Sequence, residues 1–269
     1  MYRQIKSGVL TFSLFLAAGL ALACDDPIAK AAKDLPPSPY VFMLFYDAKD
    51  KAQETYKKMF EKTVVKYNFK VNVFFDPVDI SDKESTKYLR EEYKVKTSPT
   101  TMLLSPNGTT VLKTTDKLKA AEIENIIVSP ARRKISDKLK KSTAVVVFAL
   151  EKPDKKATKK LTAILKDAQG LAREFLGGGK IEHIILPLSD KKESWLFTLM
   201  KIPEKRKEKQ FMTIVFGNGK TMQAYGGKLS KDIVLDYVQL LAHPCTCTMD
   251  WSYFEDLLMP VTVDVPEEE

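Results

Sequence analysis

The residues best suited to chemistry lie near the end of the sequence. Cys245 and Cys247 are separated by a single threonine, with His243 before them and Met249 after them. The only other cysteine among the 269 residues is Cys24. Two thiols can form a disulfide or exchange electrons. Together with an imidazole and a thioether, their thiolates can also hold a soft metal ion. The sequence therefore concentrates its thiol chemistry in one short segment.

Three roles are compatible with Cys245 and Cys247. Paired cysteines in exported proteins usually form structural disulfides. A Cys-x-Cys ring is small and strained, which makes its disulfide labile and favours thiol–disulfide oxidoreductase activity. The third role is binding of copper(I), or of zinc(II) with an outside ligand, because two thiolates alone do not complete a tetrahedral site. His243 and Met249 are the further candidate metal ligands.

Composition excludes several classes of protein. Hydrophobic residues make up 44% of the chain and charged residues 29%, which excludes a disordered tail and a polytopic membrane protein. With only two histidines, a three-histidine metal centre is also excluded. The net charge is +8, and a basic stretch spans residues 130–141. That stretch has no aromatic residues nearby to stack on bases, so we expect no nucleic-acid partner.

The first 23 residues have the pattern of a secretory signal peptide. Arg3 and Lys6 precede an uncharged stretch from Ser7 to Ala23, which ends in small residues before Cys24. We therefore expect an exported protein of the periplasm or cell envelope. If a general signal peptidase cuts after Ala23, Cys24 becomes a free N-terminal thiol on a secreted protein.

The end of this segment resembles the lipobox of bacterial lipoproteins. The matching residues are Leu20-Ala21-Leu22-Ala23-Cys24, although Ala21 stands where the family usually has leucine. The resemblance implies lipidation of Cys24 and anchoring to a membrane. The polar, proline-ended segment 24–37 would then be a flexible tether.

Two successive parts of the chain show the same order of expected elements, β-α-β-α-β-β-α. Hydrophobic patterning predicts strands at 41–46, 71–75, 100–104 and 109–112 in the first part, and at 144–150, 181–186, 211–216 and 220–225 in the second. Helices are expected at 52–67, 81–93, 118–127, 161–175, 190–200 and 230–241. An Asn-Gly pair connects the last two strands of each part, which is a strong hairpin signal.

This order, with Val95-Lys96-Thr97-Ser98-Pro99-Thr100 before the third strand, resembles the thioredoxin family. The resemblance implies an α/β fold class with two tandem thioredoxin-like domains, each a three-layer α/β/α arrangement. It implies a cis peptide bond before Pro99. It also implies that Ser98, Pro99 and Thr100 form a peptide-binding surface.

The dithiol of redox-active thioredoxins is missing from both parts. In that family a Cys-x-x-Cys follows the first strand, whereas here the segments 47–51 and 151–154 contain no cysteine. We expect Asp47 and Asp50 to cap a helix. The predicted function is non-catalytic binding or scaffolding of an envelope protein or peptide, without a cofactor. The alternatives are an oxidoreductase working through Cys245 and Cys247, and copper or zinc binding at that pair.

The expected organisation has six segments. They are a signal peptide at 1–23, a flexible tether at 24–37, a first domain at 38–129, a basic, solvated linker helix at 130–141, a second domain at 142–243 and a C-terminal tail at 244–269. The tail contains the Cys-Thr-Cys sequence, and its aromatic and apolar residues predict that it docks back on a domain.

Overall fold

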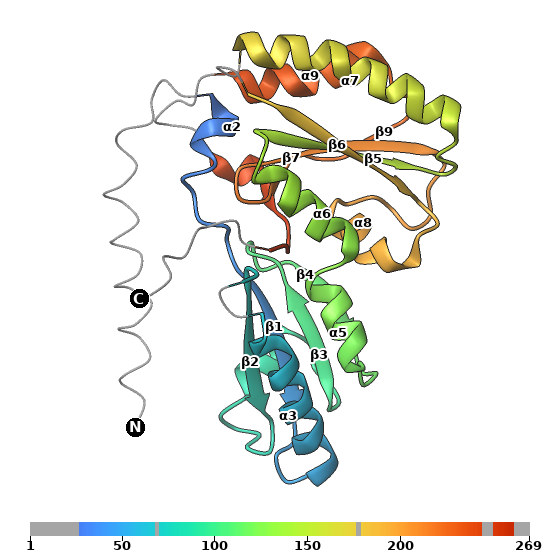
Figure 1. Cartoon of the computed structure of the whole chain (residues 1–269). Coiled ribbons are helices and arrows are strands. Elements are labelled where there is room, and N and C mark those ends of the chain that lie inside the picture. The colour runs from blue at the N-terminus through green and yellow to red at the C-terminus, as the bar shows by residue number, and fades with distance from the viewer. Residues whose placement is uncertain (1–26, 68–69, 176–178, 244–249, 261–269) are drawn as a thin grey trace.

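The computed structural model describes residues 27–67, 70–175, 179–243 and 250–260. These parts form two α/β domains that lie one above the other in Figure 1. Within them, no helix is both long and apolar enough to cross a membrane.

The first domain is built on a four-stranded sheet. Its elements are β1 (Tyr40–Tyr46), α3 (Lys51–Val65), β2 (Val73–Asp79), α4 (Lys87–Glu92), β3 (Thr100–Leu104), β4 (Thr110–Thr114) and α5 (Ala120–Ile127). The strand order is β2-β1-β3-β4, with β1 and β2 parallel and the β3–β4 hairpin antiparallel to them. The crossover helix α3 makes the parallel pair possible, and the tight turn at residues 105–109 makes the hairpin.

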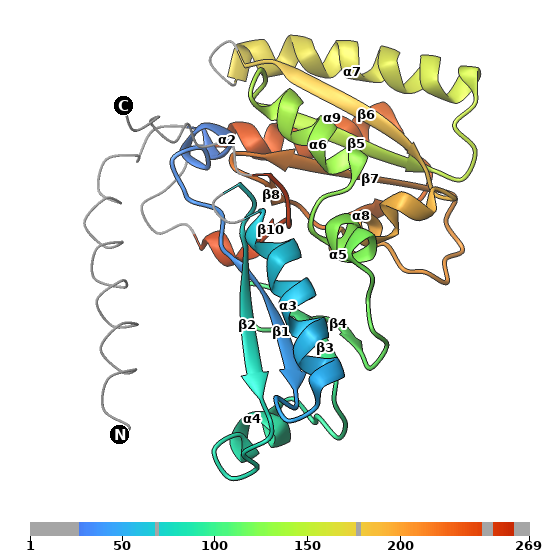
Figure 2. The same ribbon diagram turned by 60° about the horizontal axis from the view of Figure 1, so that its bottom comes forward.

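The second domain repeats this plan with additions. Its elements are α6 (Pro130–Leu139), β5 (Ala144–Leu150), α7 (Lys155–Phe175), β6 (Ile181–Pro187), α8 (Ser194–Leu199), β7 (Gln210–Phe216), β8 (Lys220–Thr221), β9 (Tyr225–Gly226), α9 (Lys231–Ala242) and β10 (Glu255–Asp256). The sheet order is β10-β8-β7-β5-β6, and β9 pairs with β7. Helices α7 and α9 cover one face of the sheet, and α6 and α8 lie on the other (Figures 1 and 2).

The predicted fold class is confirmed, because both sheets have a parallel βαβ pair extended by an antiparallel hairpin and flanked by helices. Several boundaries differ from the prediction: β2 runs four residues past its expected end at 75, and α7 begins six residues before its expected start at 161. The helix expected from Ser81 begins at Lys87, because the Asp82 carboxylate accepts from the backbone N–H groups of Glu84 and Ser85 and holds a turn there. The strand expected at 220–225 is divided into β8 and β9.

The described part of segment 24–37 is not a free tether. Residues Ile28–Ala31 form the short helix α2, and Ile28, Ala29 and Ala32 are buried in the core of the second domain. The backbone N–H of Ile28 donates to the carbonyl of His243 at 3.0 Å. The few apolar residues of this polar segment therefore pack against α9, which fixes the segment to the second domain.

Helix α6 is also more than a solvated linker. Ala131, Ile135 and Leu139 are buried in the cluster that contains Val145 of the second sheet, and Arg132 is buried toward the end of α5 and the tail, while Arg133 remains exposed. The basic residues of the expected linker thus lie on both faces of the helix, and the buried face makes α6 a layer of the second domain.

The C-terminal tail docks between the domains. Leu257, Leu258 and Met259 are almost completely buried, and they belong to a hydrophobic cluster that contains Phe60 of the first domain and Val145 of the second. One apolar core therefore continues across the domain boundary, and the tail completes it.

Candidate functional site

The proline loop lies at the start of β3. The Ser98–Pro99 peptide bond is cis, as the resemblance implied. Thr100 is buried and its hydroxyl donates to the carbonyl of Thr97 at 2.6 Å, whereas Ser98 and Pro99 are half-buried. The backbone N–H groups of Thr97 and Ser98 have no hydrogen-bond partner among the described residues. This loop therefore offers main-chain donors at a rigid, partly open position.

The turn between β1 and α3, where redox-active thioredoxins carry their dithiol, is held together here by side-chain hydrogen bonds. Asp50 caps α3 by accepting from the backbone N–H of Ala52 at 2.8 Å and from the Gln53 side chain at 3.1 Å. Those hydrogen bonds lower the pKa of Asp50, which keeps it ionised. The Gln53 side-chain oxygen in turn accepts from the backbone N–H of Asp47 at 2.9 Å.

These contacts support a structural role for Asp50. Of the two predicted capping residues, Asp50 caps the helix, and the Asp47 carboxylate instead accepts from the backbone N–H of Lys49 within the turn. Asp79, at the end of β2, accepts from the backbone N–H of Ala48 at 3.1 Å. Burial raises the pKa of Asp79, but hydrogen bonds from Ser81 and Ala48 outweigh it and lower the pKa overall.

The equivalent corner of the second domain is arranged differently. Asp154 accepts from the backbone N–H of Ala157 at 2.7 Å, near the start of α7. In place of a cis-proline loop, the Arg206 side chain donates to the carbonyls of Leu188 and Pro203 at 3.1 and 3.3 Å. The two domains therefore share a scaffold, but in the described parts of the chain the cis-proline loop occurs in the first domain alone.

The thiol candidates Cys24, Cys245 and Cys247, together with Met249, lie outside the described residues. Of that predicted set, the structure places His243, which directly follows α9 and is exposed. In the described parts of the chain, no three side chains among histidine, cysteine, aspartate and glutamate are grouped so that they could hold a metal ion.

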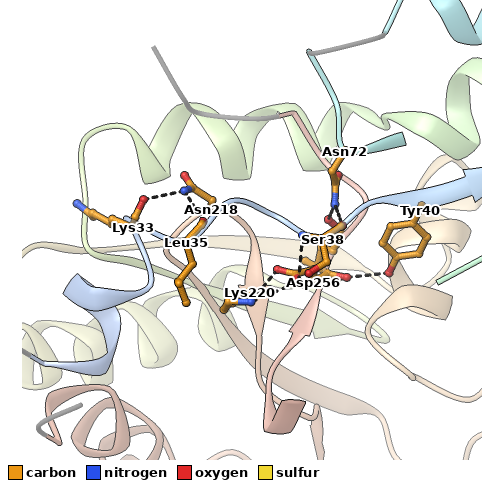
Figure 3. A network of polar contacts seen from close by, with 9 residues as sticks. Lys33, Leu35, Ser38, Tyr40, Asn72, Asn218, Lys220 and Asp256 are labelled. Atoms are coloured by element: carbon orange, nitrogen blue, oxygen red, sulfur yellow. Dashed lines mark hydrogen bonds and ion pairs between the residues drawn. The ribbon is translucent and has the colours of Figure 1, made fainter. Parts of the chain in front are cut away.

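A second polar arrangement, which the sequence analysis missed, joins the two domains (Figure 3). Lys220 of β8 and Asp256 of β10 form an ion pair at 3.2 Å, and their side chains are only 7% and 6% exposed. The Asp256 carboxylate also accepts from the backbone N–H of Ser38 at 3.3 Å. The backbone carbonyl of Asp256 accepts from the Tyr40 hydroxyl at 2.7 Å.

Asparagine side chains extend this junction on both sides. Asn72 donates to the carbonyls of Ser38 and Leu257, at 2.9 and 3.1 Å. Asn218 donates to the carbonyls of Lys33 and Leu35, at 2.7 and 2.9 Å (Figure 3). These two side chains donate to four backbone carbonyls of the N-terminal segment and the tail, and so hold both segments on the domains. No local sequence signal identifies such contacts, because each partner is distant in the chain.

Comparison with known proteins finds no match to a protein-family model and none to a curated protein. Solved structures give weak similarities. Thioredoxin-2 of the malaria parasite is 20% identical over 33% of this chain and 81% of its own, with a TM-score of 0.29. Zinc-bound human ERp44 is 13% identical over 80% of this chain and 60% of its own, with a TM-score of 0.29.

A third similar structure contains the first two thioredoxin domains of Saccharomyces cerevisiae Eps1p. It is 11% identical over 78% of this chain and 94% of its own, with a TM-score of 0.29. The thioredoxin-like fold of this chain is therefore assigned from its own strand order, helix layers and proline loop.

Proposed function

We propose that this chain is a non-catalytic binding module of the cell envelope, which holds a protein or peptide partner at the proline loop of its first domain. The observation that carries the proposal is a half-buried proline loop, where the N–H groups of Thr97 and Ser98 have no partner among the described residues, next to a corner that has no thiol. At that corner, Asp50 and Gln53 use their side chains to close the turn.

The chemistry of the loop suits an extended peptide. The N–H groups of Thr97 and Ser98, which no described residue accepts from, are main-chain donors of the kind that bind a peptide by strand addition. Half-buried Pro99 supplies an apolar contact beside them. The loop is anchored by buried Thr100, so little conformational freedom is lost when a partner binds.

Selection from a library of random dodecapeptides against the full chain tests this proposal. Peptides that bind should lose about tenfold or more in affinity when Pro99 is replaced by alanine, measured by isothermal titration calorimetry. The control is Pro106→Ala, because Pro106 is exposed in the hairpin turn and also follows a serine. Equal losses in both variants, or no selectable peptide, would contradict the proposal.

An oxidoreductase that works through Cys245 and Cys247 is the competing function. Turbidity of insulin in the presence of dithiothreitol reports disulfide reduction. We expect the chain to accelerate it no more than the Cys245→Ser/Cys247→Ser double variant does. Acceleration that the double variant abolishes would favour the oxidoreductase. Metal analysis of the purified chain, after exposure to copper and zinc and then a mild chelator, tests binding at the same pair.

A further inference from the structure

A cleft lies between the two domains, beside the junction of Figure 3. Its volume is about 490 Å³, within the range of roughly 300–1,000 Å³ that small-molecule sites occupy. The β3–β4 hairpin of the first domain forms one wall, and the end of α8 with tail residues 251–256 forms the other. Sites between domains are a common location for ligands.

The charged side chains that line the cleft are already paired with one another. Lys220 pairs with Asp256, and Lys201 pairs with Glu255 at the rim. The described lining therefore has two positive and two negative side chains, with no net charge and no unpaired ion. A phosphate or another strongly charged ligand would have to break one of these pairs, so the lining favours a neutral ligand.

Hydroxyl groups supply the remaining polarity of the lining. Thr109 and Thr110 on the hairpin and Ser252 on the tail are exposed. The hydroxyls of Thr109 and Thr110 make no hydrogen bond to any described residue, whereas the Ser252 hydroxyl bonds to the Asp250 carboxylate and still has its oxygen lone pairs as acceptors. Each hydroxyl can both donate and accept, as can the hydroxyl groups of a saccharide. Asn107 adds a side-chain amide to the same wall.

The indole of Trp251 completes the site. Trp251 lines the cleft, is partly exposed, and packs against Phe254 with ring centroids 6.0 Å apart. The Lys220 ammonium lies 5.9 Å from the centre of the Trp251 ring. An indole held in this way offers a flat apolar surface for the C–H face of a pyranose ring.

From these observations we infer that the interdomain cleft binds a neutral saccharide of about disaccharide size. The ring would pack on Trp251, and its hydroxyls would bond to Thr109, Thr110 and Ser252. A peptide fits the cleft less well, because the outward carbonyl of Asp256 on the edge strand β10 is already bonded to Tyr40. This inference is independent of the peptide site that we propose at the proline loop.

Tryptophan fluorescence provides a direct test. The chain has two tryptophans, so the Trp195→Phe variant leaves Trp251 as the sole reporter. We expect its emission to change saturably on titration with at least one of maltose, cellobiose and N,N′-diacetylchitobiose. Saturation-transfer NMR of the natural chain with the same sugars should show binding of the same disaccharide.

Matched variants locate the binding site. Thr198 lines the cleft on α8, and Thr162 lies on α7 outside the cleft lining; both are exposed, and both donate to the carbonyl four residues earlier. Thr198→Phe fills the cleft and should weaken binding by about tenfold or more, whereas Thr162→Phe should leave it unchanged.

Three outcomes would overturn the inference. The first is that none of the three sugars binds at high-millimolar concentration by either method. The second is that Thr198→Phe leaves the affinity unchanged, which would place the binding elsewhere. The third is that trialanine binds with the same sensitivity to Thr198→Phe while the sugars do not, which would make the cleft a peptide site.

Discussion

The hydroxyl of Tyr40 donates to the backbone carbonyl of Asp256 at 2.7 Å, across 216 positions of sequence. This bond joins the first strand of the first domain to the strand that the tail adds to the second sheet. Burial raises the pKa of Tyr40 well above its ordinary value, so the phenol stays protonated and remains a donor. The relative position of the two domains therefore depends on the tail.

Asp256→Asn tests the buried ion pair at this junction. The substitution keeps the shape of the side chain but leaves the Lys220 ammonium buried without an opposite charge. We expect the free energy of unfolding to fall by about 3–5 kcal/mol, measured by urea denaturation. Glu255→Gln is the control, because the Lys201 partner of that pair is 62% exposed, and we expect a loss of about 1 kcal/mol or less. Similar losses for both variants would show that burial of the pair is unimportant.

Arg132→Lys tests a buried guanidinium that connects three parts of the chain. Arg132 is fully buried, and burial lowers its pKa to about 10. It donates to the carbonyls of Asn125 at 2.6 Å, Ile126 at 2.8 Å and Leu258 at 2.8 Å. Because a lysine cannot reproduce this fork of donors, we expect a loss of about 3 kcal/mol in urea denaturation.

The matched control for Arg132 is its neighbour on α6. Arg133 is exposed, so Arg133→Lys should change the free energy of unfolding by about 0.5 kcal/mol or less. If Arg132→Lys lowers the free energy of unfolding by equally little, the guanidinium is not needed to hold the end of α5 against the tail.

Leu258→Ala tests whether the tail completes the shared core. Leu258 is fully buried between the domains, so its truncation should cost about 2–5 kcal/mol. It should also speed proteolysis between the domains. Tyr253 is 82% exposed on the same tail, and Tyr253→Ala should have an effect of about 0.5 kcal/mol or less. A stable Leu258→Ala variant would argue against tail docking.

Glu182 predicts a specific dependence of stability on pH. Hydrogen bonds from Lys138 and Lys180 lower the pKa of this carboxyl from 4.5 to about 2. The folded state favours the ionised form, so this contribution is complete above about pH 4.5 and is lost as the pH falls toward 2. Urea midpoints of the natural chain and of Glu182→Gln should therefore differ at neutral pH and converge near pH 2.

The control for this pH effect is Glu151→Gln. Glu151 and Lys209 are 3.3 Å apart, with side chains 52% and 74% exposed, so solvent screens the pair. The urea midpoint of Glu151→Gln should therefore lie closer to that of the natural chain at neutral pH than the midpoint of Glu182→Gln does. A difference in urea midpoint between the natural chain and Glu182→Gln that persists near pH 2 would contradict the lowered pKa of Glu182.

Much of the candidate site at the proline loop could be predicted from local sequence. Pro99 marked the cis bond through a family resemblance, and the absence of cysteine at 47–51 is evident in the sequence. The contribution of Gln53 could not be predicted, because its side chain reaches back to Asp47 only when the turn has formed. The start of α4 was misplaced because the carboxylate of Asp82 caps a turn instead of the helix.

The sequence by itself determined the order of strands and helices, the two hairpins and the loss of the dithiol, because each depends on patterns within a few neighbouring residues. Only the tertiary structure decided how the domains are joined and where the interdomain cleft lies. The partner of Lys220 is 36 positions away and that of Tyr40 is 216 positions away. Such contacts form only when the apolar tail is buried, and burial of that tail is a property of both domains together.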